Sequence, residues 1–492
     1  MSVNAFFAAL RDPARAQHLA LRSPADTLTY AALVDRVRDC SEQLSRSGAS
    51  IVASLLDNGV DWIVLDLACL ASGAVHLPLP LFFTPEQIAA TLRASGAQAL
   101  ACAASDAGRL AGFGFSPSSV AGELALLRRQ AQPAQLPAGT DKITFTSGST
   151  GLPKGVCLGG AAMLAVAAGL AQATAPLGIA RHLVALPLPV LLENIAGVYA
   201  PLLHGAMVDV RPLAQVGLSG SSQFEPAKLH AALTEARADS VIVLPQMLRA
   251  YAGWLHATRH PAPAGLRLVA VGGAAVGTTL LGQARAAGLP AYEGYGLSEA
   301  ASVQTLNLPG ADLPGSAGRP LPHARVRIND AGEIEVAGSL ALGYLGEPAA
   351  RRAWWPTGDL GRIDAAGFLH IQGRAKNVLI TGFGRNVSPE WVEVALTSQP
   401  EIRHAVVLGE GQAALGAVIW PQGAQDDAAL ARAIARANQH LPDYARIGPW
   451  TRGRADFSAA AGLATANGRP RRDAIHQCHA DLFSPSEQPL QP

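Results

Sequence analysis

The densest group of chemistry-bearing residues in this chain is a run of hydroxyls and glycines that ends in one lysine, TFTSGSTGLPKGV at 144–156. Glycines let successive backbone amides converge on an anion, hydroxyl groups add donors, and the lysine adds a compact positive charge. The pattern therefore predicts a polyphosphate cradle built by Thr146, Ser147, Gly148, Ser149, Thr150, Gly151 and Lys154.

This run differs from the Walker A loop of P-loop kinases. Counted from Gly148, Pro153 stands where that loop has its second glycine, and Gly155 follows the lysine where Ser or Thr is required. A flexible linker is the alternative interpretation of a Ser/Gly run. The chain has 34 arginines and four lysines, so a lysine at this position favours the cradle.

Five further motifs follow the cradle in order along the chain, at 272–274 (GGA), 295–299 (YGLSE), 357–359 (TGD), 373–376 (GRAK) and 384–390 (GRNVSPE). With the run at 146–155, they resemble the signature motifs of the adenylate-forming enzymes. This superfamily includes acyl-CoA synthetases, peptide-synthetase adenylation domains and luciferases. Because six motifs in one order are specific, the chain is identified as a member of this superfamily.

The resemblance implies a role for each matching residue. Adenine would lie between Gly272, Gly273 and Ala274 on one side and Tyr295 with Gly296 on the other, where a tyrosine face can stack on a base. Glu299 would supply a carboxylate oxygen to Mg²⁺, beside the hydroxyl of Ser298. Asp359 and Arg374 would bind the ribose. Lys376 would be the hinge of a mobile C-terminal domain, with Gly382, Phe383 and Gly384 facing a thiol arm.

Arginine replaces the catalytic lysine of the family near the C-terminus. The family motif resembles TxxGKxxR, and this chain reads TANGRPRR at 465–472, with no lysine after Lys376. Arg469 stays cationic and can bind phosphate and carboxylate oxygens, so stabilisation of the transition state can survive. The alternatives are slow adenylation, a preference for the second half-reaction, or a nucleotide-binding pseudoenzyme.

The residues expected around the acyl group also depart from the family pattern. Amino-acid-activating relatives carry an aspartate where this chain has Leu192, so a fatty or aromatic acid is favoured over an amino acid. Asn194 occupies the place where many acyl-activating relatives carry histidine, and no catalytic role is assigned to it. The predicted acyl lining consists of Asn194, Gly197 and Val198, with Gly272 and Gly273.

These residues predict a two-step ligase. A carboxylic acid would react with Mg-ATP to give an acyl-adenylate and pyrophosphate, and a thiol, coenzyme A, would then give a thioester and AMP. A carrier-protein phosphopantetheine is the alternative acceptor. Six arginines and one aspartate at 444–472 could meet CoA phosphates or an acidic carrier protein, and a solvated face is an equal alternative.

The elements that must position these residues follow an α/β pattern. Helical patterns alternate with short apolar runs from residue 26 to about 245, which predicts a mainly parallel sheet whose carboxyl edge binds ligands. Short strands after residue 315 predict a small β-rich layer. We expect a large N-terminal domain at 1–375 and an α+β cap at 376–492, with an unstructured tail from about 484. A helix should begin with Ser388 as N-cap and Pro389 in its first turn.

Composition limits the partners. With 492 residues, a formal charge of +1 and 15% charged residues, the chain has no global field for nucleic acid or anionic membranes. The uncharged stretch 155–180 is rich in Gly and Ala and follows the polar loop, so we expect a buried helix there and no membrane span. The N-terminus lacks the features of a signal peptide. Five scattered cysteines without a CxxC pair argue against disulfides and indicate a cytoplasmic protein.

Overall fold

A computed structural model describes residues 1–121, 124–146, 154–220, 223–350, 352–381, 385–465 and 468–483. Two large sheets form most of the molecule. The first is mixed, and its strands lie in the order β21 (Gly343–Tyr344), β9 (Lys154–Leu158), β8 (Lys142–Thr146), β4 (Val75–Pro78), β3 (Ile51–Leu55), β5 (Ala99–Ala103), β7 (Leu124–Arg128) and β6 (Ser116–Ala121). Its centre, from β8 through β4 and β3 to β5, is parallel.

The second large sheet has a parallel centre and antiparallel edges. Its order is β18 (Arg319–Pro320), β17 (Ser302–Leu306), β16 (Ala291–Leu297), β15 (Leu268–Val271), β14 (Ser240–Val243), β10 (Arg181–Leu183), β11 (Met207–Asp209), β1 (Leu19–Arg22) and β2 (Thr27–Thr29). Strands β16, β15, β14, β10, β11 and β1 run parallel. The predicted α/β class with mainly parallel strands is therefore confirmed, and antiparallel strands complete the edges of both sheets.

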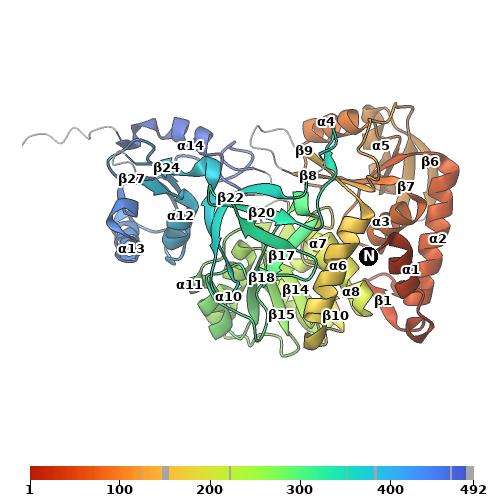
Figure 1. Cartoon of the computed structure of the whole chain (residues 1–492), viewed down its shortest axis with the longest axis horizontal. Helices are drawn as coiled ribbons and strands as arrows, with labels where there is room; N and C mark the ends of the chain where they lie inside the picture. The colour runs from red at the N-terminus through yellow and green to blue at the C-terminus, as the bar shows by residue number, and fades with distance from the viewer. Residues whose placement is uncertain are drawn as a thin grey trace, which may run out of the picture.

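Helices cover both sheets and fill the space between them (Figure 1). Helix α3 (Val60–Ser72) packs against β4 of the first sheet, and α2 (Tyr30–Ser47) packs against α3 and against β1 and β2 of the second sheet. On the second sheet, α9 (Pro226–Ala236) contacts β10 and α11 (Thr278–Ala286) contacts β16, with α10 (Pro245–Thr258) packed against both helices. Helices α4 (Pro85–Ser95) and α5 (Ala107–Leu110) flank β5 in the chain. Helix α4 shows how sequence sets a helix start: Thr84 and Gln87 form a capping box, and Pro85 takes the first helical position.

Helix α6 (Gly160–Thr174) lies where the sequence predicts a buried apolar helix. Within the described residues, 160–177 is the one segment long and apolar enough by composition to cross a membrane. It packs against α1 (Val3–Leu10), α8 (Ala200–His204) and β17 and buries, among others, Met163, Leu164 and Leu170. Its apolar residues therefore contribute to the core between the two sheets.

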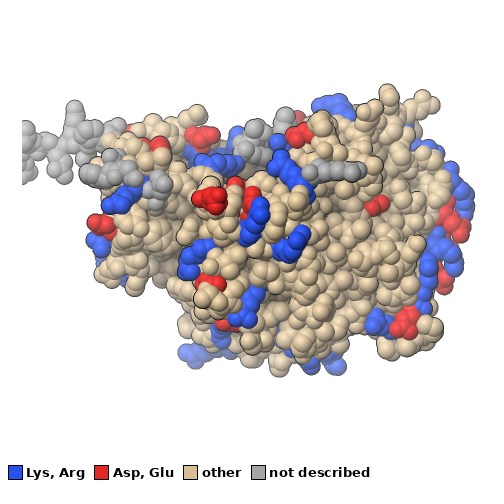
Figure 2. All heavy atoms as spheres, in the orientation of Figure 1, with Lys and Arg blue, Asp and Glu red and all other residues tan. Residues whose placement is uncertain are grey.

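A four-stranded antiparallel sheet follows, in the order β19 (Arg325–Ile328), β20 (Glu333–Ala337), β22 (Trp355–Ile363) and β23 (Leu369–Arg374). This sheet confirms the predicted β-rich layer after residue 315. In Figure 1 it lies between the large sheets and the C-terminal lobe. On the face in Figure 2, charged side chains gather over this sheet and along α2, and most of the remaining surface is uncharged.

The C-terminal lobe is an α+β unit with its own core. Strands β26 (Ile402–Leu408), β27 (Leu415–Pro421) and β28 (Ile447–Arg452) form its sheet, with α12 (Pro389–Thr397), α13 (Asp427–Gln439) and α14 (Arg472–Cys478). Two hydrophobic clusters built from residues 379–483 stabilise it. Ser388 does precede α12, but it makes no side-chain cap bond, because its hydroxyl donates to Glu390 at 2.9 Å.

All five cysteines lie in described parts of the chain and are free. The expected tail from about 484 lies outside the described residues. The cytoplasmic location stays a prediction.

Candidate active site

The two ends of the predicted phosphate cradle lie on neighbouring strands. Strands β8 and β9 pair antiparallel, and Thr146 at the end of β8 is the register partner of Lys154 at the start of β9. The predicted residues Ser147, Gly148, Ser149, Thr150 and Gly151 lie outside the described residues. Because β8 runs parallel to β4, the carboxyl end of β8 lies at the sheet edge where open α/β sheets bind ligands.

One aromatic residue that the sequence analysis missed, Tyr344, contacts both Lys154 and Glu299. The Lys154 Nζ lies 5.1 Å from the centroid of the Tyr344 ring and 3.7 Å from Glu347 Oε1. The Tyr344 hydroxyl donates to Glu299 Oε1 at 2.9 Å. Glu299 is half-buried in the 3₁₀ turn Ser298–Ala300. The predicted phosphate and Mg²⁺ ligands therefore border one space.

Asp359, Arg374 and Tyr295 form the second part of the site. Asp359 and Arg374 are cross-strand partners in β22 and β23, and Arg374 Nε lies 2.9 Å from Asp359 Oδ1. The Tyr295 hydroxyl donates to Asp359 Oδ2 at 2.6 Å. Each carboxylate oxygen thus has one partner and retains a lone pair for a ribose hydroxyl.

Burial shifts the pKa values of Asp359 and Tyr295. Asp359 is 6% exposed, and burial raises its pKa, although Arg374 and Tyr295 act in the opposite direction. Burial and the neighbouring Asp359 raise the pKa of Tyr295 well above its usual value. Tyr295 therefore stays a hydrogen-bond donor to the carboxylate at neutral pH.

Arg469 reaches this site from the C-terminal lobe. The turn that carries it is closed by Thr465 N donating to Arg469 O at 2.7 Å. Arg469 is exposed, but desolvation by the surrounding protein and the charge of Arg374 lower its pKa. Asp359 and Glu299 act in the opposite direction. Both carboxylates thus stabilise the charged guanidinium.

The predicted adenine loop leaves the carboxyl end of β15. Gly272 is buried, and Gly273 and Ala274 are exposed. The loop is tied to β16 because Val276 N donates to Glu293 Oε1 at 3.1 Å. At Gly296 the neighbouring strand comes so close that a Cβ atom would lie 2.2 Å from Ser302 O. Only glycine fits there, beside the register shift that follows Tyr295.

The predicted acyl-lining residues 194–198 lie in a closely packed part of the chain. Asn194 is 1% exposed, Val198 is fully buried, and a Cβ on Gly197 would lie 2.2 Å from Glu193 Oε1. Their role in the acyl lining stays a prediction. Leu192 is half-buried and lies against Gly272, since a Cβ there would be 3.5 Å from Leu192 Cδ2.

Asn194 lies in a short π-helix, Asn194–Tyr199, between α7 (Leu191–Glu193) and α8. Residues five apart share a face of a π-helix. Asn194 Nδ2 and the Tyr199 hydroxyl accordingly both donate to Asp66 Oδ2, at 2.9 and 2.8 Å. Lys142 Nζ also donates to Asn194 Oδ1.

These side chains belong to a buried polar cluster that the sequence analysis missed. Lys142 Nζ lies 2.8 Å from Asp66 Oδ1, and His76 Nδ1 contacts the same oxygen at 2.5 Å. Although burial opposes the charged form, Lys142 and His76 hold the pKa of Asp66 well below its usual range. One available signal was Asp66 itself, a lone charge within the apolar run WIVLDLACLASGAV.

The predicted hinge, Lys376, is exposed in a 3₁₀ turn between β23 and the C-terminal lobe. On one side of it, Gly373 lies directly against the start of α12, and on the other Asn377 Nδ2 donates to Glu390 Oε1 at 2.5 Å. Gly382, Phe383 and Gly384 lie outside the described residues. The hinge role stays a prediction.

The arginine-rich segment 444–472 is partly neutralised within its own lobe. Arg452 pairs with Asp427 at 2.6 Å, and Arg454 pairs with Asp481 at 2.5 Å. Arg472 pairs with Glu393 at 2.5 Å. Half of the six arginines are thus engaged by acidic residues, which weakens the interpretation of this segment as an anion-binding patch.

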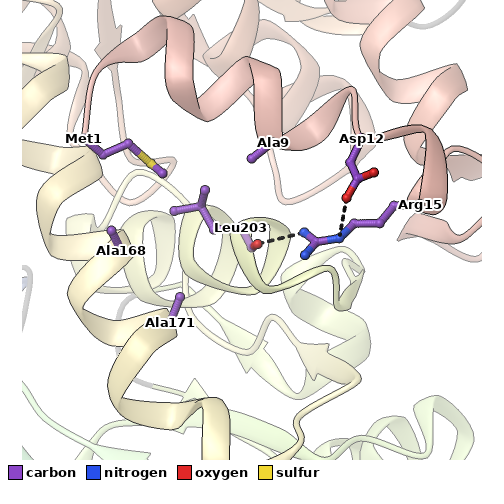
Figure 3. A pocket seen from close by; sticks show the side chains of 7 residues that line it. All are labelled: Met1, Ala9, Asp12, Arg15, Ala168, Ala171 and Leu203. Carbon is purple, nitrogen blue, oxygen red and sulfur yellow. Dashed lines mark hydrogen bonds and ion pairs between the residues drawn. The ribbon is translucent and has the colours of Figure 1, made fainter.

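Two surface pockets lie away from these residues. The first, of about 250 Å³, lies between α1, α6 and α8, where Arg15 contacts Leu203 O at 2.9 Å and Asp12 at 3.7 Å (Figure 3). The second, of about 340 Å³, is lined by residues such as Phe82 and Pro189. Among the described residues, no predicted site residue lines either pocket. The convergence of charged residues therefore identifies the site better than surface shape does.

Comparison with known proteins agrees with this geometry. Residues 9–345 match the model of the AMP-binding enzyme family, and residues 376–480 match the AMP-binding enzyme C-terminal domain. A long-chain-fatty-acid–CoA ligase, FadD15, of Mycobacterium bovis is 30% identical over 433 residues, covering 73% of this chain and 71% of that protein. A feruloyl-CoA synthase of Amycolatopsis sp is 30% identical over 429 residues, covering 79% of this chain and 82% of the synthase.

Among solved structures, the o-succinylbenzoate coenzyme A synthetase of Bacillus subtilis in complex with ATP and magnesium has the same fold. Its TM-score is 0.76 at 22% identity, over 96% of this chain and 99% of that one. From the motifs, the assembled site and these matches, the chain belongs to the AMP-binding enzyme family.

Proposed function

We propose that this protein is an AMP-forming acid–CoA ligase. It activates a carboxylic acid with Mg-ATP to an acyl-adenylate and transfers the acyl group to the thiol of coenzyme A. The observation that carries the proposal is the contact of Tyr295 and Arg374 with Asp359, which joins the second large sheet to the four-stranded sheet. The charges of Asp359 and Glu299 act on Arg469 of the C-terminal lobe.

In the first step, an oxygen of the substrate carboxylate attacks the α-phosphorus of ATP. A bond forms between that oxygen and phosphorus, the bond to the β-phosphate oxygen breaks, and pyrophosphate leaves. Charge develops on the α-phosphate oxygens and on the leaving group, so fixed cations accelerate the step. Lys154 lies at the cradle and Arg469 near Asp359, so the two cations act from opposite domains.

The nucleotide is held by groups already in place. Asp359 accepts hydrogen bonds from the ribose hydroxyls, and its pairing with Arg374 and Tyr295 fixes its orientation. Holding the reactants in line removes much of the entropic cost of the bimolecular step.

Glu299 fits a hard cation that prefers oxygen ligands. Its Oε1 accepts the Tyr344 hydroxyl, which leaves Oε2 for Mg²⁺ bound to the ATP phosphates. Bound Mg²⁺ would neutralise charge on the phosphates.

In the second step, the thiol of coenzyme A attacks the carbonyl carbon of the adenylate. A carbon–sulfur bond forms, the carbon–oxygen bond to AMP breaks, and AMP leaves with that oxygen. The C-terminal lobe moves about Lys376 between the two steps, because Arg469 must leave the site to admit the thiol.

The acid carries an apolar group. Leu192 lies against Gly272 at the edge of the site and offers no charge to an α-ammonium group, which favours fatty or aromatic acids. Two relatives are ligases for a long-chain fatty acid and a feruloyl group, in line with this choice.

The test incubates the full-length protein with ATP, Mg²⁺ and CoA and a panel of fatty acids of increasing length and aromatic acids. Pyrophosphate release and thioester formation are measured together. We expect acid-dependent release of pyrophosphate, with a matching thioester for at least one acid. Release without any thioester when CoA is supplied, but with transfer to a carrier-protein phosphopantetheine, would contradict CoA as the acceptor.

Arg469→Ala and Arg469→Lys test the cation from the C-terminal lobe. We expect Arg469→Ala to reduce pyrophosphate release by about a hundredfold, as for loss of one transition-state donor. Activity that rises in Arg469→Lys above the native level would show that arginine impairs adenylation. Absence of pyrophosphate release across the whole panel, with nucleotide still bound, would show a pseudoenzyme.

A further inference from the structure

We propose that Tyr344 is a positioning residue that sets the separation of the phosphate-binding cation and the metal-binding carboxylate. This inference rests on the proposed function, since it concerns how Lys154 and Glu299 are held for Mg-ATP. The sequence motifs gave no role to Tyr344.

The two functional groups of Tyr344 contact two different site residues. Its hydroxyl donates to Glu299 Oε1 at 2.9 Å, and its ring faces Lys154 Nζ at 5.1 Å from the centroid. A cation within about 6 Å of a ring centroid is attracted by the ring electrons. One rigid side chain thus relates the positions of both charges.

Tyr344 is itself held by backbone and by packing. Strand β21 pairs with β9 so that Tyr344 faces Val156, two residues beyond Lys154. Ala341 N donates to Glu299 O at 2.7 Å, which holds the backbone of Glu299 beside the segment that leads to Tyr344. The Trp355 ring packs edge-on against the tyrosine, with centroids 5.9 Å apart. Because the tyrosine cannot swing freely, its hydroxyl points to one place.

The tyrosine hydroxyl engages one oxygen of the Glu299 carboxylate, Oε1. The ammonium of Lys154 contacts both the tyrosine ring and Glu347, whose Oε1 is 3.7 Å from Nζ. Loss of the hydroxyl should therefore disturb the metal ligand, and loss of the ring should also disturb the lysine.

Two substitutions separate these effects. Tyr344→Phe keeps the ring and removes the hydroxyl, whereas Tyr344→Leu removes both. Tyr292→Phe, on a tyrosine that packs against Arg285 elsewhere, is the matched control. Thermal melting of all three variants checks that each one folds.

Calorimetry of ATP binding is measured with Mg²⁺ and with EDTA, and pyrophosphate release is measured across a series of Mg²⁺ concentrations. We expect Tyr344→Phe to raise the Mg²⁺ concentration for half-maximal activity by about tenfold, as for loss of one hydrogen bond to a charged group, and to leave ATP affinity in EDTA unchanged. Tyr344→Leu should also weaken ATP binding in EDTA by about two- to fivefold.

The inference is overturned if Tyr344→Phe shows the same Mg²⁺ dependence as the native protein in both ATP binding and pyrophosphate release. It is also overturned if Tyr344→Phe and Tyr344→Leu weaken ATP binding in EDTA by the same factor. Native protein that binds no Mg-ATP would instead refute the proposed function. The two failures are therefore distinguishable.

Discussion

Glu293 should make the protein less stable as the pH rises, and Glu293→Gln should remove this effect. Its carboxyl is 8% exposed in β16 and accepts Val276 N at 3.1 Å. Burial raises its pKa from 4.5 to about 7. Between these two values the folded state binds a proton that the unfolded state has lost, so stability falls as pH rises through this window.

The pKa difference between 4.5 and about 7 corresponds to about 3 kcal/mol of unfolding free energy, lost between pH 4 and pH 8. Glutamine keeps an oxygen for Val276 N and carries no charge. We therefore expect the melting temperatures of the two proteins to be close near pH 4.5, and the variant to be more stable at pH 8.

Melting curves measured at half-unit pH intervals provide the assay, and Glu42→Gln, at an exposed glutamate with a 57% exposed side chain, is the control. Because a chain with two domains need not unfold in one step, the difference between variant and native protein is compared at each pH. A difference that stays constant from pH 4.5 to pH 8 would refute the reasoning.

Two further substitutions test the core and the domain contact. Lys142→Met leaves the carboxylate of Asp66 buried without its lysine partner and should lower the free energy of unfolding by about 3–5 kcal/mol. Adding Asp66→Leu should restore most of this loss, as measured by melting temperature. Equal loss of stability in the single and double variants would contradict this reasoning. Gly373→Ala places a Cβ 1.8 Å from Ser388 Oγ, at φ +143°, and should reduce pyrophosphate release at least tenfold by displacing α12. Gly332→Ala, at φ +78° with open space around it, controls for backbone strain, and equal effects of the two would show that the contact is unimportant.

The site residues that carry charge were predictable because each lies in a compact motif. Asp359 and Arg374 were assigned to one ribose from motifs apart in the sequence, and the β22–β23 hairpin brings them into register. Arg469 was assigned from the lysine position of its motif, and Asp359 and Glu299 act on its charge. For Asp359 and Arg374, each residue follows from its local motif and its partner follows from simple strand pairing.

The contacts of Asn194 could not be predicted in the same way. A helical pattern gives no sign of a π-turn, which rotates Asn194 toward Asp66 in a distant helix. Asp66 lies 128 residues from Asn194 in the sequence, and the role of its charge is evident only once the fold places Lys142 beside it. Tyr344 was missed for a related reason, since its role arises from the pairing of a two-residue strand with β9.

Transfer of labelled oxygen tests the central chemistry most directly. The acid that supports turnover is supplied with ¹⁸O in its carboxylate, together with ATP, Mg²⁺ and CoA, and the AMP is analysed by mass spectrometry. Attack of the carboxylate on the α-phosphorus predicts AMP that carries one ¹⁸O atom, formed together with pyrophosphate and the thioester. Unlabelled AMP, or the appearance of ADP with labelled phosphate, would contradict an acyl-adenylate at this site.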